Sequence, residues 1–228
     1  MGTWRPVSVL PGRFVFAHVC CIQVIKLGWL GPNGCKRESY MQLLISVWKF
    51  LESFGHTTRA QKPSEQNGKD YVFVAREKME QNIAEGKFIE HGEYKGNLYG
   101  TSAESVETIV NSGRVCVLSP HWQALKMLRT PRLRPYIVFI KPPLLERLIE
   151  TRTAASARST FDKESSRAFT EEEFADIIRS SNRINFLYGY MFDEEIVNAD
   201  LATALTQLLR AAWRVQSEPL WVPASWVQ

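Results

Sequence analysis

Three side chains of this sequence carry the donor groups that a phosphate monoester needs. A phosphorylated side chain or a nucleoside monophosphate has close to two negative charges and three acceptor oxygens. Arg59 offers a planar fork of N–H donors, and Tyr71 and Tyr99 each offer a hydroxyl at the end of a rigid ring. Taken one at a time, the same residues also fit a surface ion pair and two ordinary strand aromatics. The residue types alone therefore leave an anion pocket and a structural role open.

Residues 31–38 are the best match in the chain to a nucleotide phosphate loop, and the match is poor. Such loops follow the pattern G-x-x-x-x-G-K-[ST], in which backbone N–H groups, the lysine and the hydroxyl meet the phosphates and magnesium. Here Lys36 stands at the second glycine, Arg37 at the lysine and Glu38 at the hydroxyl position. A Cβ at position 36 hinders close approach of the backbone, and the Glu38 carboxylate repels the phosphates. We therefore expect no ATP-dependent phosphoryl transfer.

The elements that would position these groups alternate regularly from residue 70 onward. Apolar runs that predict strands lie at 71–74, 115–118, 136–140 and 195–198, and helices are predicted at 76–84, 121–128, 144–152 and 201–215. Residues 88–94 and 97–99 predict a hairpin that turns at Lys95-Gly96. Strands that alternate with helices predict an α/β fold with a parallel sheet.

Single residues and local composition indicate further elements. Thr101 with Glu104 has the spacing of a capping box for a helix that ends near Gly113. Thr170 precedes three glutamates and begins a long helix, whereas residues 153–166 have the composition of a loop. Before residue 54 the pattern is irregular, and we predict only a strand at 19–25 and a helix at 39–54.

Composition narrows the classes of function. The chain has 228 residues, of which 45% are hydrophobic and 23% charged, as in an ordinary globular protein. The net charge of +4 is not clustered, so nucleic acid is not an expected partner. The apolar stretch 14–30 is short and interrupted for a membrane span, which predicts a soluble protein. His56 and His91 lack the spacing of metal ligands, and we expect neither a metal nor a cofactor.

Several motifs follow one another along the chain. They are His56-Thr57-Thr58-Arg59, Asn67-Gly68-Lys69-Asp70-Tyr71, Phe88-Ile89-Glu90 and the segment 92–102. Their order and spacing, maintained over about residues 56–216, resemble the guanylate-kinase-like domain of the membrane-associated guanylate kinase homologues. The ending 221–227 is similar to that of their palmitoylated membrane protein subfamily.

The resemblance implies a domain organisation. The fold would be α/β, with a P-loop-kinase-like parallel sheet flanked by helices and a small mixed β subdomain that binds a monophosphate. Residues 1–53 would form an atypical N-terminal segment with the degenerate phosphate loop, and residues 54–217 the guanylate-kinase-like domain. Within it, 56–102 would be the GMP-binding-like subdomain and 143–190 a lid-like helical region. Residues 218–228 are similar to a strand of the adjacent Src-homology-3 domain.

The resemblance also implies roles for individual residues. Arg59, Tyr71 and Tyr99 match the side chains that hold the phosphate of the monophosphate. Three further residues match positions around the same ligand: Lys62 replaces a second arginine, Glu90 reads the guanine edge and Thr101 supplies a hydroxyl near the base. Enzymes of the family carry acids after the strand that begins at Val115, whereas this chain has Ser119-Pro120-His121 there. That change would weaken guanine recognition and magnesium positioning.

The function that follows is a scaffold domain with no catalytic residues. It would bind partner proteins, in particular phosphorylated peptides, through the former GMP site, and weak binding of GMP itself stays open. The family resemblance implies a cytoplasmic location, peripheral to the plasma membrane or to cell junctions. Two alternatives remain: an active or weakly active guanylate kinase that uses ATP and GMP, and a partly folded, non-functional variant, since residues 1–53 depart from the family pattern.

Overall fold

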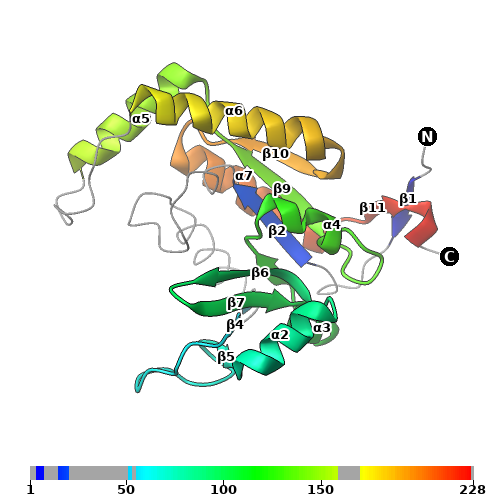
Figure 1. The fold of residues 1–228 in the computed structure, drawn as a ribbon. Coiled ribbons are helices and arrows are strands. Elements are labelled where there is room, and N and C mark those ends of the chain that lie inside the picture. Colours follow the sequence, from blue (N-terminus) through cyan, green and yellow to red (C-terminus); the bar gives the residue numbers. More distant parts are fainter. Residues whose placement is uncertain (1–3, 8–14, 21–50, 53–54, 159–169, 227–228) are drawn as a thin grey trace.

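The computed structural model describes residues 4–7, 15–20, 51–52, 55–158 and 170–226. Its largest element is a five-stranded sheet (Figure 1). In spatial order the strands are β10 (Glu194–Val197), β9 (Tyr136–Lys141), β2 (Val15–Cys20), β8 (Cys116–Leu118) and β3 (Leu51–Glu52). All four pairings are parallel, which confirms the predicted parallel α/β sheet.

Helices cover both faces of this sheet. Alternate residues of its buried strands point in opposite directions and pack against one helical layer or the other. Cys116, Leu118 and Phe139 belong to a core that also includes residues of α3 (Ala103–Asn111), α4 (Leu125–Leu128), α5 (Leu145–Arg158) and α6 (Glu171–Tyr188). Val117 and Val138 point the other way and pack with α7 (Leu201–Ser217). The sheet and its two helical layers place the ends of β8 and β9 at fixed positions.

A second, four-stranded sheet carries the predicted phosphate-binding residues. Its order is β5 (Val72–Phe73), β4 (His56–Thr57), β7 (Asn97–Ser102) and β6 (Phe88–Tyr94). Figure 1 shows it below the larger sheet, beside α2 (Arg76–Ala84). Met79 of α2 is fully buried against Phe88 and Leu98, so this sheet has an apolar cluster of its own.

The hairpin β6–β7 forms as predicted. Lys95 and Gly96 both have positive φ angles, 49° and 74°, as the two central residues of a type I′ turn require. This turn matches the natural twist of the paired strands, and β6 and β7 run antiparallel from it. The position of Tyr99 and Thr101 along β7 follows from this register.

The chain ends meet in a third, two-stranded sheet. Strand β1 (Trp4–Val7) pairs antiparallel with β11 (Leu220–Pro223), which follows α7. The short helix η4 (Ala224–Trp226) comes next, and the Arg129 guanidinium carbon lies 5.9 Å from the Trp226 ring centroid. The tail is thus attached to α4 by a cation–π contact as well as by strand pairing.

Four predicted boundaries were wrong. Ser102, not Thr101, caps α3, because Thr101 is still part of β7 while the Ser102 hydroxyl accepts the Ser105 backbone N–H at 3.1 Å. The helix α5 continues to Arg158 through an alanine-rich segment that had the composition of a loop, since alanine favours helix.

The other two errors lie near the N-terminus. Leu51–Glu52 is a strand that pairs with β8, whereas a helix was predicted through residue 54. Strand β2 (Val15–Cys20) contains the first two residues of the predicted strand 19–25 and begins four residues earlier. Residues 21–25 lie outside the described part of the chain. Leu51–Glu52 pairs with β8, and β2 pairs with both β8 and β9, so neighbouring strands far along the chain define these elements and no local pattern reports them. The rest of the predicted helix 39–54 lies outside the described residues.

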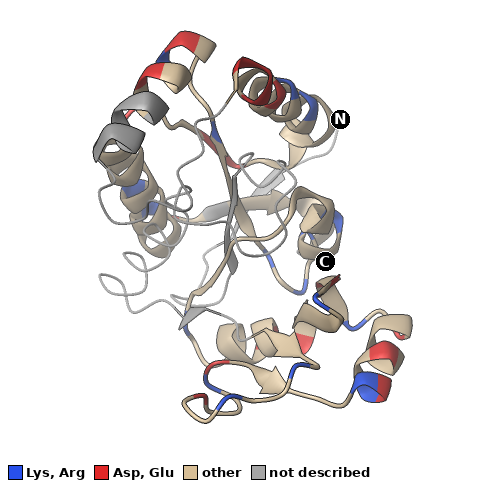
Figure 2. Cartoon of the chain, turned by 60° about the vertical axis from the view of Figure 1, so that its left-hand side comes forward, with Lys and Arg blue, Asp and Glu red and all other residues tan. Residues whose placement is uncertain are grey.

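The surface carries both signs of charge. Figure 2 shows acidic and basic segments side by side on the same helices, in agreement with the unclustered charge of the sequence. Among the described residues, no helix combines the length and the apolar character that a bilayer crossing requires.

Replacement of Gly100 by alanine should destabilise the small sheet. A Cβ at this position would lie 2.8 Å from the Glu90 carbonyl oxygen and 2.8 Å from the Phe88 ring. We expect a loss of about 2 kcal/mol in the free energy of unfolding, measured by urea denaturation. Gly92→Ala is the matched control, since a Cβ there meets nothing within 4 Å. Equal stability of the two variants would contradict the close approach.

Candidate functional site

The backbone of β4 fixes where Arg59 leaves the small sheet. Thr57 is paired with Phe73 on one side and with Tyr99 on the other. Thr58 then exchanges two hydrogen bonds with Leu98: its N–H donates to the Leu98 carbonyl at 3.0 Å, and its hydroxyl accepts the Leu98 N–H at 2.9 Å. Because the strand is held on both edges up to this point, the Arg59 side chain starts from a rigid position.

Arg59 lies against the aromatic side chains that the sequence predicted as its partners. Its guanidinium carbon is 5.5 Å from the Tyr71 ring centroid and 5.6 Å from that of Phe73. The Tyr71 and Tyr99 rings are 6.2 Å apart, edge to face. The structure therefore brings Arg59, Tyr71 and Tyr99 together, and Phe73 adds a contact that the sequence analysis did not include. Cation–π contacts of this kind hold the guanidinium plane in place.

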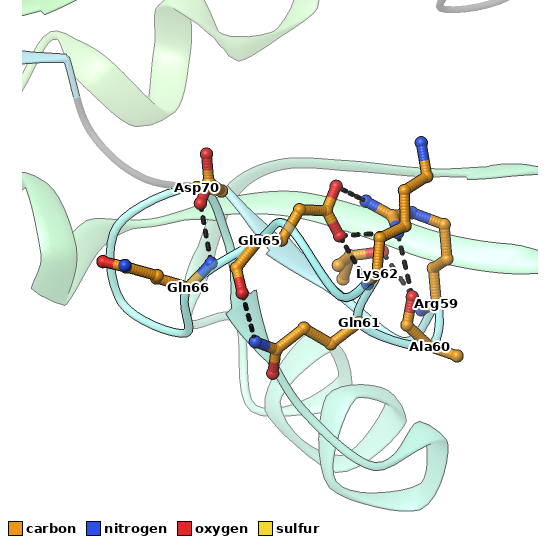
Figure 3. A network of polar contacts seen from close by, with 8 residues as sticks. Arg59, Ala60, Gln61, Lys62, Glu65, Gln66 and Asp70 are labelled. Carbon is orange, nitrogen blue, oxygen red and sulfur yellow. Dashed lines mark hydrogen bonds and ion pairs between the residues drawn. The ribbon is translucent and has the colours of Figure 1, made fainter.

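The Arg59 fork is engaged by Glu65, as Figure 3 shows. Nη1 donates to Oε2 at 3.0 Å and Nη2 donates to Oε1 at 2.8 Å, which is a bidentate ion pair. The two side chains are only 22% and 15% exposed. The hydrogen bond from Arg59 lowers the pKa of Glu65 to about 2. In the other direction, the bond to Glu65 raises the pKa of Arg59, and a hydrogen bond with Tyr99 raises it further.

Lys62 lies next to this pair but contributes through its backbone. Its N–H donates to Glu65 Oε2 at 2.9 Å, and its carbonyl accepts the Glu65 N–H at 3.0 Å. The second bond closes a β-turn with Pro63 as its first central residue, the position that proline favours. The Lys62 residue is exposed, so its ammonium group can act as a point charge at the rim of the site.

Glu90 and Thr101 are paired across the hairpin and belong to a second part of the site. Glu90 Oε2 accepts the backbone N–H of His121 at 2.8 Å. This bond connects the small sheet to the segment after β8, where Ser119-Pro120-His121 replaces the acids of the enzymes. Burial lowers the pKa of the His121 imidazole and so favours its neutral form.

His56 is a structural residue in this arrangement. Its ring packs edge to face against that of Phe88, with 5.3 Å between the centroids. Burial lowers the pKa of His56, although the negative charge of Glu104 acts to raise it. Its Nδ1 is buried and makes no hydrogen bond to the described residues. Across that same part of the chain, no group of three or more His, Cys, Asp or Glu side chains could hold a metal ion.

Two features of the site were missed by the sequence analysis. Glu65 is the partner of Arg59, and the Pro63-Ser64 turn between them was a usable signal, because a tight turn returns the chain toward its start. The bond from His121 to Glu90 joins residues far apart in the chain, and no pattern indicates it. The degenerate phosphate loop at 31–38 lies outside the described residues.

The chain is similar in sequence to known proteins. The sequence pattern of the guanylate kinase family matches residues 27–214. The chain belongs to the guanylate kinase family. It is 44% identical over 200 residues to MAGUK p55 subfamily member 7 of Danio rerio and 41% identical over 201 residues to Protein PALS1 of the same organism. These matches confirm the family resemblance predicted from the motifs.

The matches span most of this chain but a smaller share of each relative. They cover 86% and 87% of the chain but 35% and 28% of the two relatives, so the chain spans about a third of their length. Guanylate kinase from Anaplasma phagocytophilum has a similar structure, with a TM-score of 0.52 and 24% identity over 92% of this chain and 90% of that one. This likeness confirms the predicted P-loop-kinase-like α/β fold.

Arg59 should control the titration of Glu65. We expect the Glu65 carboxyl carbon, followed by NMR, to titrate near pH 2 in the wild type and at a clearly higher pH in Arg59→Ala, still below the ordinary glutamate range because the Lys62 N–H continues to donate to it. Because the folded-state pKa is lowered, the stabilisation is complete above about pH 4.5 and is lost as the pH falls through about 2. Arg76→Ala is the control, since Arg76 contacts Glu80 and Glu93 instead. An unchanged Glu65 titration in Arg59→Ala would contradict the ion pair.

Proposed function

We propose that this chain is a binding domain without phosphoryl-transfer activity, and that it recognises phosphorylated segments of partner proteins at the pocket of Arg59, Tyr71 and Tyr99. The observation that carries the proposal is the bidentate contact of Arg59 with a carboxylate. A guanidinium that already binds one planar oxyanion in this geometry has its donors oriented for another. The ring faces of Tyr71 and Phe73 support that orientation.

The surroundings of Arg59 suit a dianion better than a neutral ligand. The guanidinium side chain is only 22% exposed, so its interaction with an anion is screened less than at an open surface. Lys62 adds a second positive charge at the rim, and the tyrosine rings supply hydroxyl groups. We assign Glu90 and Thr101 to the far edge of the same ligand surface, where GMP would place its base. Weak GMP binding is compatible with this set.

The proposed absence of phosphoryl transfer is based on the residues of the phosphate loop and of the segment 119–121. Phosphoryl transfer requires close positioning and neutralisation of the ATP phosphates. Lys36, Arg37 and Glu38 replace the glycine, lysine and hydroxyl that perform those tasks in a phosphate loop. The segment 119–121 supplies no acid for magnesium. A monophosphate pocket without a triphosphate site can bind but has no phosphoryl donor.

The family supports a scaffold role for this binding. The relatives at 44% identity and below include MAGUK p55 proteins, and membership of that group makes protein partners the expected ligands. We propose a cytoplasmic location, peripheral to the plasma membrane or to cell junctions. We also propose that residues 54–217 form the binding domain, that 143–190 is a lid-like region, and that the tail 218–228 belongs with the strand system of an adjacent domain.

A paired peptide titration tests the phosphate pocket. Phosphoserine peptides and their unphosphorylated twins would be titrated by calorimetry into the wild type, Arg59→Ala and the control Arg76→Ala. We expect the wild type and Arg76→Ala to prefer the phosphorylated peptide, and Arg59→Ala to lose about 2–3 kcal/mol of its binding free energy, since a bidentate charge-assisted contact is removed. Equal binding of both peptides, independent of Arg59, would refute the pocket.

An ATP-coupled assay tests the loss of catalysis. With magnesium, ATP and GMP at millimolar concentration we expect no ADP above a blank without protein, because the residues at 36–38 cannot position the triphosphate. Turnover that requires GMP and scales with protein concentration would show an active kinase and overturn this part of the proposal.

A further inference from the structure

The carboxylate of Glu65 occupies the donors that the proposed ligand would need. It accepts from Arg59 Nη1 at 3.0 Å, from Arg59 Nη2 at 2.8 Å and from the backbone N–H of Lys62 at 2.9 Å (Figure 3). Arg59 Nη1 also donates to the Ala60 carbonyl at 2.9 Å. These contacts use three of the five N–H donors of the guanidinium, including both donors of its end-on face. A phosphate that binds this end-on face must therefore displace Glu65.

Glu65 is held in this position by its own short loop. The β-turn from Lys62 to Glu65 sets its backbone, and the Gln61 side chain donates to the Glu65 carbonyl at 2.5 Å. The next residue, Gln66, donates its N–H to Asp70 at 2.8 Å. Only five residues separate Glu65 from Arg59, so the carboxylate is present at a high effective concentration.

The same local attachment makes the contact exchangeable. The loop 60–66 pairs with no strand, and its residues other than Glu65 are exposed. Glu65 can therefore leave the Arg59 fork by a change in this loop, while β4, β5 and β7 keep their register. The ion pair is a removable occupant and not a part of the apolar core.

We propose, on the basis of the function proposed above, that Glu65 is an internal competitor that occupies the anion pocket in the absence of ligand and sets the affinity threshold for any anion that enters. The end-on face of Arg59 is available only in the fraction of molecules in which Glu65 has left it. The apparent affinity of a ligand that binds this face is its intrinsic affinity multiplied by that fraction. Weak carboxylate ligands then fall below a useful affinity, whereas a phosphate dianion, with more charge and more acceptor oxygens, stays above it.

The test uses one isosteric variant and two minimal probes. Glu65→Gln removes the charge and keeps the size, and Glu80→Gln is the matched control because Glu80 is also paired with an arginine, Arg76. The probes are the blocked tripeptide glycine–phosphoserine–glycine and its twin with glutamate at the centre. Binding is measured from the NMR signal of the Arg59 side-chain N–H, assigned with Arg59→Lys, and native amide shifts verify the fold of each variant.

We expect both probes to bind about fivefold more tightly to Glu65→Gln than to the wild type, the factor that corresponds to about 1 kcal/mol for one competing ion pair. Glu80→Gln should bind as the wild type does. Saturating phosphoserine probe should also move the Glu65 carboxyl titration of the wild type toward the ordinary glutamate range. An unchanged or weaker affinity in Glu65→Gln would mean that Glu65 supports Arg59, and it would overturn the proposal. A gain for the phosphoserine probe alone would indicate through-space repulsion and would overturn it as well.

This experiment is separable from the test of the proposed function. Matching gains for the two tripeptides, together with equal binding of phosphorylated and unphosphorylated peptides by the wild type, would leave Glu65 a competitor in a pocket that serves no phosphopeptide. Arg59-dependent phosphopeptide binding without any gain in Glu65→Gln would do the reverse: the proposed function would stand and the internal competitor would be refuted.

Discussion

The two hydrogen-bonded edges of β7 determine where the parts of the candidate site lie. One edge pairs with β4, which delivers Arg59, and the other pairs with β6, which delivers Glu90. Tyr99 and Thr101 are two residues apart on β7 and therefore share a face. Gly100 lies between them, where the Glu90 carbonyl and the Phe88 ring approach too closely for a side chain. A single strand thus aligns the proposed phosphate-binding residues with those proposed for the rest of the ligand.

The sequence was sufficient where the causes of structure are local. The hairpin was predicted from Lys95-Gly96, and the limits of α2 were predicted from its residue pattern. The proximity of Arg59 to two tyrosines was predicted from the spacing of motifs in a known family. Contacts made by distant partners could not be predicted. Leu51–Glu52 is a strand because β8 lies beside it. The capping of α3 was decided by how far β7 continues, and one residue more of strand moved the cap from Thr101 to Ser102.

The two acids of the site differ in the way they are held. Glu65 is bound by residues of its own loop, so its position depends on a turn and an ion pair. Glu90 is bound by His121, which follows the carboxyl end of β8. In open parallel sheets, ligands bind at the carboxyl ends of the strands. The hydrogen bond between Glu90 and His121 therefore links the small sheet to the carboxyl ends of the strands of the large sheet. This is where a ligand of this fold is expected, and the bond holds the two sheets close together at that place.

The small sheet has an apolar cluster of its own, and this supports the proposal that an anion site can persist without phosphoryl transfer. Every donor in the proposed pocket comes from residues 57–101, which contain their own apolar cluster of Met79, Phe88 and Leu98. The register of β4 and β7 is set by pairing among the described residues 56–102. Catalysis needs both sites at once, because transfer joins a donor to an acceptor. Binding needs only one, and in this chain the pocket around Arg59 has the contacts that hold its geometry.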